Sequence, residues 1–218
     1  MLYAHPRNSD SPTAAGGEAH GGVLAARGRL AGRFLPAARA SGDRQVLVPA
    51  LVIAAVTELA RGASSTAHAL LVEYDEATRG YEAWRAHELP HAARVAVAVG
   101  AEALVEAAVA EANQWLPRDR CCVATAQAVL AEAGGRVDEA AVFYRNAAEA
   151  WQHFGGAVEL AHALLGAGRF VMSADVPGEA VQLLETARRA FAALGAEPRV
   201  AEAQALLATV TADTHGGV

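Results

Sequence analysis

Two histidines with the spacing of metal ligands are the first residues in this chain that could do chemistry. His87 and His91 stand four positions apart, which places two imidazoles on one face of a continuous helix. Pro90 lies between them, however, so the sequence predicts that the histidines flank a turn. A metal site also needs a third ligand and supporting hydrogen bonds, which the neighbouring sequence does not supply. We therefore expect no metal ion and no cofactor.

Two further groups of residues could take part in catalysis. Cys121 and Cys122 are adjacent, and a disulfide between neighbouring residues strains the chain, so we expect two buried thiols in a reducing compartment. A vicinal redox pair is the alternative. Glu139 and Glu179 occupy equivalent positions at two expected helix starts, where carboxylates stabilise the helix N-terminus. None of these groups predicts a catalytic residue.

The composition excludes several classes of function. All 18 basic residues are arginine, so a P-loop lysine, a Schiff-base lysine and a Ser-x-x-Lys nucleophile are ruled out. A net charge of −6 argues against a nucleic-acid-binding surface. The longest apolar run, residues 46–56, contains Pro49 and is too short to cross a bilayer, and no signal peptide is visible. We expect a cytoplasmic protein that is not an enzyme and binds neither nucleic acid nor membrane.

A repeat of 40 residues indicates how the elements are arranged. Residues 138–155 read DEAAVFYRNAAEAWQHFG, and residues 178–195 read GEAVQLLETARRAFAALG. The aligned apolar residues recur three and four positions apart, which predicts amphipathic helices. A period of this length is typical of stacked helical hairpins. The expected fold is all-α, a right-handed α-solenoid of antiparallel helix pairs.

Composition along the chain predicts three parts. Residues 1–20 are rich in Pro, Gly, Ser, Asn and Asp without periodicity, which is typical of a disordered segment. Residues 21–213 form the helical repeat domain, because helical periodicity is interrupted there only by short turn signals. Residues 214–218 form a flexible tail. Three tryptophans are expected to pack in the core or between repeats: Trp84, Trp115 and Trp151.

The repeated segment resembles a tetratricopeptide array. Gly168, Ala180 and Ala187 fall at the spacing of that family's small residues, and Leu184 stands where it has a large one. The period of 40 residues is longer than the family's usual period of about 34. Residues 119–210 also resemble the C-terminal repeat region of large bacterial ATPase-type regulators, including LuxR-type activators and multidomain nucleotide cyclases. The runs GGRVDEAAVFYRNAAEAWQHFGGAVELAHALLGAGRF and ARRAFAALGAEPRVAEAQALLA carry that resemblance.

These resemblances imply a non-catalytic protein-interaction module that is part of, or derived from, a bacterial transcriptional or signalling regulator. The sequence has no nucleotide-binding glycine loop, cyclase segment or following helix-turn-helix, so ATP hydrolysis and DNA binding are not implied. The alternative is a small-molecule effector-sensing domain. A deep closed pocket would favour the sensor, whereas an open concave surface would favour binding of a protein or peptide.

Transferring the tetratricopeptide register onto Gly168 gives candidate binding residues, because the first helix of each pair lines the groove in that family. The C-terminal helix keeps an apolar set, Val200, Ala203, Leu206, Leu207 and Val210, which allows self-association through that helix. The polar residues expected in the groove are Thr125, Glu132, His162, Arg169 and Gln204.

Overall fold

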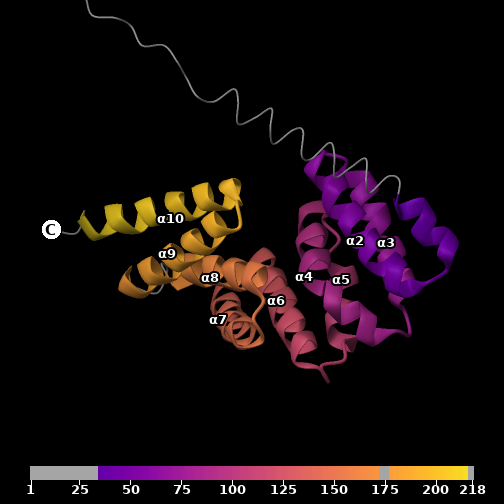
Figure 1. The fold of residues 1–218 in the computed structure, drawn as a ribbon. Coiled ribbons are helices and arrows are strands. Elements are labelled where there is room, and N and C mark those ends of the chain that lie inside the picture. Colours follow the sequence, from indigo (N-terminus) through magenta and orange to yellow (C-terminus); the bar gives the residue numbers. More distant parts are fainter. Residues whose placement is uncertain (1–33, 172–176, 216–218) are drawn as a thin grey trace, which may run out of the picture.

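The computed structural model describes residues 34–171 and 177–215, and the regular elements in these ranges are helices (Figure 1). The predicted all-α class is therefore confirmed, whereas the segment 1–20 lies outside the described residues. None of the helices in the described ranges could cross a membrane, given their lengths and apolar content. After a helical stretch at 34–41, the helices are α2 (Arg44–Ala60), α3 (Ser64–Thr78), α4 (Glu82–Val99), α5 (Glu102–Glu111), α6 (Pro117–Ala133), α7 (Val137–Phe154), α8 (Ala157–Val171), α9 (Pro177–Ala193) and α10 (Glu197–His215).

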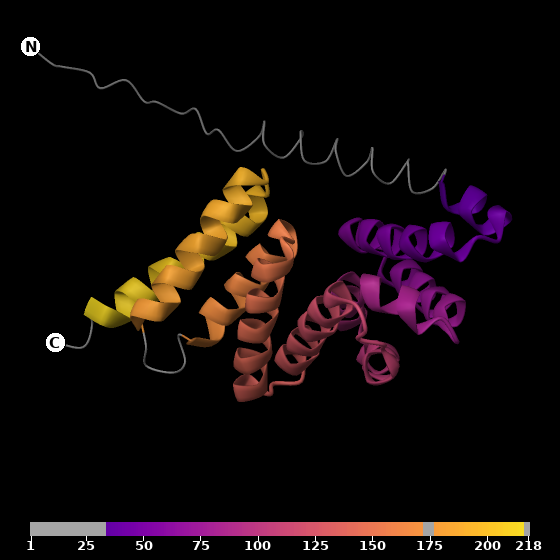
Figure 2. The ribbon, with the colours of Figure 1, turned by 60° about the horizontal axis from the view of Figure 1, so that its bottom comes forward.

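Most helices pack against the helix that precedes them in the sequence. The contacts run from α2 to α3, and from α6 through α7, α8 and α9 to α10. The short helix α5 interrupts this order, because α4 packs mainly on α6. Figure 2 shows the result: α2 and α3 lie at one end of the molecule and α9 and α10 at the other.

The 40-residue period is visible in the helix boundaries. Helices α7 and α9 begin at residues 137 and 177, and α8 and α10 begin at 157 and 197. Gly155 and Gly195 follow α7 and α9 with φ of 94° and 66°, a left-handed conformation that glycine adopts without steric cost. Helix α10 continues to His215, beyond the predicted domain end at 213. The equivalent core positions are all buried: Ala140 and Ala180, Tyr144 and Leu184, Ala147 and Ala187, Trp151 and Phe191.

Helix α4 is continuous, and the prediction of a turn at Pro90 is wrong. His87 and His91 therefore do lie on one helix. A proline inside a helix removes one backbone hydrogen bond, which is the usual reason for a break. Here Ala86 and Leu89, on the same helix, are completely buried, so packing of α4 against its neighbours outweighs the lost bond.

Trp115 is the clearest departure from the expected core. Its side chain is 85% exposed, whereas Trp151 is buried as predicted and the side chain of Trp84 is outside the described set. Apolar residues recur three and four positions apart in the sequence as far as Trp115, but α5 ends at Glu111. Pro117 is the first residue of α6 and holds the preceding residue in an extended conformation, so Trp115 falls in a loop.

Both cysteines are buried and unpaired, in agreement with the expected pair of thiols. Burial raises the pKa of Cys122 to about 12, so this side chain is a neutral thiol at neutral pH. A buried, protonated thiol is a poor nucleophile.

Candidate functional site

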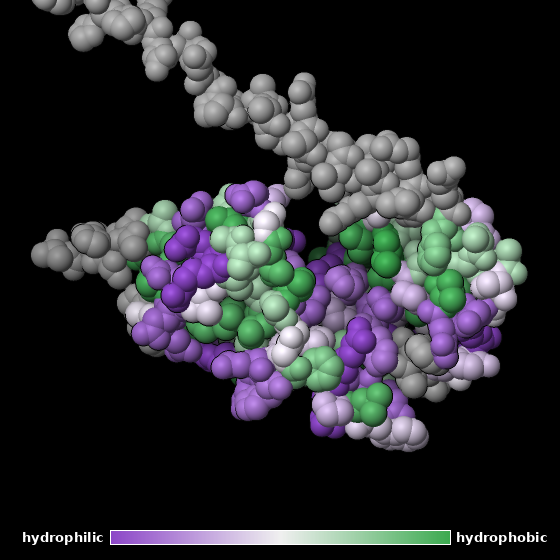
Figure 3. Space-filling view, in the orientation of Figure 1, coloured by the Kyte–Doolittle hydropathy of each residue, from purple (hydrophilic) through white to green (hydrophobic). Residues whose placement is uncertain are grey.

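A pocket of about 290 Å³ is the candidate functional site. Its lining comes from α4, α6, α7, α8 and from Arg199 of α10, so it collects residues far apart in the sequence. Figure 3 shows the surface hollowed between α9–α10 and α2–α4, with hydrophilic side chains along the walls of the hollow. The apolar part of the lining includes Val97, Val129 and Leu165.

Ion pairs connect the helices that line the pocket. Arg94 on α4 donates through both Nη atoms to Glu159 on α8, at 3.0 Å and 2.5 Å. Arg169 on α8 donates to Glu132 on α6 and, at 2.6 Å, to Glu202 on α10. Arg199 donates to the other oxygen of Glu202 at 2.6 Å. The pairs of Arg169 and Arg199 are about one-third to one-half exposed and contribute little stability individually, but with the more buried Arg94–Glu159 pair they fix the geometry of the arginines.

Glu132 also accepts a hydrogen bond from the hydroxyl of Tyr144 on α7. Burial, followed by the negative charge of Glu132, raises the pKa of Tyr144. Glu159 behaves in the opposite way. Burial favours its neutral form, but the hydrogen bonds and positive charge of Arg94 outweigh this and lower its pKa. Tyr144 therefore stays protonated and Glu159 stays ionised at neutral pH.

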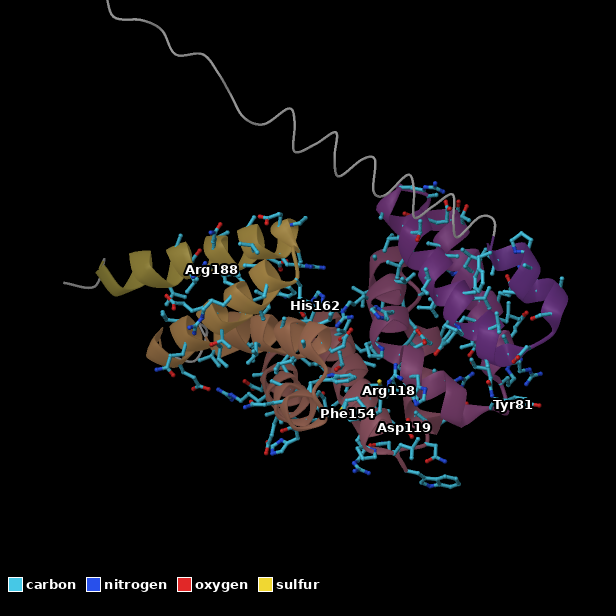
Figure 4. The ribbon with its side chains drawn as sticks, viewed as in Figure 1. Tyr81, Arg118, Asp119, Phe154, His162 and Arg188 are labelled. Carbon is cyan, nitrogen blue, oxygen red and sulfur yellow. The ribbon has the colours of Figure 1, made fainter. Side chains whose placement is uncertain are left out.

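His162 is the neutral polar group of the pocket. It lies on α8 and faces the hollow (Figure 4), and its ring meets Phe191 edge-on with 5.0 Å between centroids. Burial and then the positive charge of Arg94 lower its pKa to about 3, so the imidazole is uncharged at neutral pH. Within the described ranges, neither ring nitrogen has a hydrogen-bond partner.

The structure brings together three of the five residues predicted for the groove. Glu132, His162 and Arg169 all line the pocket. Thr125 is only 1% exposed, and its hydroxyl accepts a hydrogen bond from Nε1 of Trp151 at 2.8 Å, so it is not accessible to a ligand. Gln204 is exposed on α10 but does not line the pocket.

Sequence reasoning missed the two arginines that complete the pocket. Arg94 lies 65 positions before its partner Glu159, and no repeat or motif connects them. Arg199 stands at the start of α10, where a lone arginine gives no signal of a site. The sequence did contain a signal for Tyr144. It carries a hydroxyl at a repeat position where the next repeat has the apolar Leu184.

The two histidines of α4 lie close to different carboxylates. Nε2 of His87 lies 3.1 Å from Oδ1 of Asp119, and Nε2 of His91 lies 3.9 Å from Oε1 of Glu159. Each imidazole therefore approaches a different carboxylate. No cluster of three or more potential metal ligands occurs among the residues that the structure describes.

A second hollow, of about 690 Å³, lies between the start of α6 and the end of α7. Arg120, Glu149, His153 and Phe154 are among its lining residues, and Figure 4 shows Phe154 at this end of α7. Among the described residues, no ion pair joins the side chains that line this second hollow, in contrast to the first pocket.

In comparison with known proteins, the chain matches no family model and no curated protein.

Proposed function

We propose that the chain is a non-catalytic interaction module of a bacterial transcriptional or signalling regulator, acting in the cytoplasm. In this proposal its helices form a right-handed, tetratricopeptide-like solenoid of antiparallel pairs. The hollow face binds a protein or peptide partner, and the pocket receives one side chain or one chain end of that partner.

The observation that carries this proposal is the convergence of Arg94, Glu132, His162, Arg169 and Arg199 on one pocket from α4, α6, α8 and α10. Folding alone does not require charged side chains from four helices to meet at an open surface. The side chains are paired with one another as acids and bases, rather than set out as a nucleophile with an activating base. This arrangement supports recognition of a ligand rather than catalysis.

The size of the pocket is equally compatible with a second function, the binding of a small effector molecule. Its volume of about 290 Å³ is close to the lower limit of small-molecule sites, roughly 300 Å³. A compact effector molecule would fill it as well as a peptide side chain would. The second candidate function is therefore an effector-sensing domain of the same kind of regulator, using the same residues.

Peptide display on the immobilised full-length chain tests the main proposal. Selected peptides are expected to protect segments of α4, α8 and α10 from hydrogen exchange. Ala133 is exposed at the rim of the pocket, so Ala133→Trp should block binding without disturbing the core. Arg61→Ala, on the exposed end of α2, is the matched control and should bind normally. Peptides that bind Ala133→Trp as tightly as the wild type would contradict a role for this pocket.

Self-association through α10 stays a prediction. Val200, Ala203 and Val210 are buried in the core that α10 shares with α9, and Leu206 and Leu207 pack partly against it. Light scattering at several concentrations tests the prediction, because a mass that rises with concentration supports it and a constant monomer mass contradicts it.

A further inference from the structure

The hydrogen-bonding capacity of the pocket is unbalanced, because its carboxylates are satisfied and its guanidinium groups are not. Both oxygens of Glu159 accept from Arg94, and both oxygens of Glu202 accept from Arg169 and Arg199. Glu132 accepts from Arg169 and Tyr144 through different oxygens. Each carboxylate oxygen in the network therefore already has a donor.

The arginines retain donors. A guanidinium group carries five N–H bonds. Within the described part of the chain, Arg94 and Arg169 each use two of them on carboxylates, and Arg199 uses one. His162 adds an imidazole whose ring nitrogens are unbonded there. Unused donors are the largest remaining hydrogen-bonding capacity of the pocket, so a ligand that complements it mainly accepts hydrogen bonds.

Charge limits which acceptor fits. The network contains three arginines and three glutamates, and His162 is uncharged, so its formal charges cancel. Because the charges of the network cancel, a second negative charge on the ligand gains no net attraction, whereas it costs more to remove from water. A monoanion with two acceptor oxygens also matches the planar fork of a guanidinium.

The rest of the lining indicates the remainder of the ligand. Val97, Val129, Ala133 and Leu165 supply apolar surface beside the arginines. A compact apolar body would bury against these side chains while its charged group faces the guanidiniums. The volume of about 290 Å³ leaves room for a small molecule or for one residue of a peptide.

The geometry points to a binding site for a carboxylate on a compact apolar body, held by Arg94, Arg169 and Arg199. This inference rests on the proposed binding function of the pocket and names the chemical group that it recognises. The carboxylate belongs either to a small organic acid or to the free C-terminus of a peptide with an apolar last residue.

Isothermal titration of the full-length chain tests the preference for a carboxylate. The probes are hexanoate and benzoate, their uncharged amides hexanamide and benzamide, and inorganic phosphate. Because hydrogen bonds to charged groups are the stronger kind, each acid should bind at least about tenfold more tightly than its amide. Each acid should also bind at least about tenfold more tightly than phosphate, which has no apolar body to bury against the lining. An amide that binds as well as its acid, or phosphate that binds better than both acids, overturns the inference.

Amino-acid substitutions test whether hexanoate binds in this pocket. Arg199→Gln should weaken hexanoate binding about tenfold or more, because a charged donor is lost. This side chain is 46% exposed, so the variant is expected to fold. Ala133→Trp should abolish binding by filling the pocket, and Arg61→Gln should leave it unchanged. Wild-type affinity in folded Arg199→Gln or in Ala133→Trp overturns the site.

Peptides separate the two sources of the carboxylate and separate this inference from the proposed function. Peptides selected by display are prepared with a free C-terminus and with an amidated one, and each form competes with hexanoate. Competition by the free acid alone assigns a peptide terminus, and binding of the small acids without any selected peptide assigns an organic acid. If peptides bind at the pocket equally well in both forms and the acids do not bind, the inference fails while the proposed function stands. If no peptide and no acid binds, both fail.

Discussion

Arg85 and Arg169 each organise a network of hydrogen bonds, but in opposite surroundings. Arg85 on α4 is 3% exposed, and its guanidinium donates to Asp75, Thr78 and Glu111 at distances from 2.7 to 3.3 Å. Arg169 on α8 is 33% exposed, opens onto a pocket and keeps unused donors. The same side chain therefore holds α3, α4 and α5 together in one region and offers recognition chemistry in the other. Among the described residues, Arg85 makes four hydrogen bonds with its five N–H groups and Arg169 makes two. The share of donors already in use, rather than the presence of ion pairs, separates the two roles.

The largest expected effect is on the buried network. Arg85→Ala removes the buried ion-pair partner of Asp75, which keeps its pair with the exposed Arg79. Losing one member of a buried pair costs roughly 3–5 kcal/mol. Urea denaturation of Arg85→Ala and of the surface control Arg61→Ala measures the difference in the free energy of unfolding. A loss below about 1 kcal/mol in Arg85→Ala, typical of exposed pairs, would remove the distinction between the two regions.

The second prediction concerns the close approach of α8 to α7. A Cβ at Gly166 would collide with the ring of Tyr144, so Gly166→Ala forces the tyrosine ring away from Glu132. Overpacking of this kind costs roughly 1–3 kcal/mol. Gly178→Ala is the matched control, because a Cβ there meets nothing within 4 Å. Equal free energies of unfolding for the two variants would contradict tight packing at the pocket floor.

The third prediction uses pH. His162 has a pKa of about 3 in the folded protein and about 6.5 when unfolded, so the unfolded state binds more protons between these values. The stability that neutral His162 contributes is therefore fully present above about pH 6.5. The free energy of unfolding falls as the pH is lowered towards 3, by at most about 1.4 kcal/mol per pH unit for this group.

His162→Gln should flatten that dependence, which denaturation between pH 7 and pH 5 measures. His91 has a lowered pKa through burial and contributes with the same sign, so some slope remains. The lowered pKa of Glu159 matters only at more acidic pH, near and below its unfolded value of 4.5. An unchanged slope in His162→Gln would show that the imidazole is not buried in its neutral form.

The smallest expected effect on stability is that of Arg169→Ala. Its ion pairs are about one-third exposed, so we expect a loss of no more than about 1 kcal/mol. Hexanoate binding should fall about tenfold or more in the same variant, because a charged donor is removed. A stability loss as large as that of Arg85→Ala would place both arginines in the same structural role.

The predictability of each region from the sequence follows from how local its signals are. Helices α7 and α9 could be predicted because residues three and four apart form their buried faces, and the pattern recurs after 40 residues. The break assigned to Pro90 was wrong because burial of α4 is a tertiary effect that no local signal records. Trp115 was misplaced because its apolar spacing continues past the true end of α5.

In the candidate site, too, residues within the repeat could be predicted, and residues brought in by tertiary packing could not. Glu132 and Arg169 could be proposed from the register of one repeat on the next, although they stand 37 positions apart. Arg94 belongs to a helix outside that register, so only the folded chain brings it to Glu159. Thr125 has the spacing of a groove residue, but its hydroxyl is covered by Trp151 of the neighbouring helix. Which side of a helix is covered depends on the packing of its neighbours, which the spacing alone does not give.

The coincidence of helix starts at 137 and 177, and at 157 and 197, bears on how the length of this chain can change over evolution. Repeat proteins readily gain or lose whole units, since each unit contacts only its neighbours. A forty-residue duplication placed between α8 and α9 would preserve the local packing, but it would carry Arg199 and Glu202 away from Arg94 and Arg169. Selection for an intact pocket would therefore fix the number of units after α8, although folding alone would tolerate more.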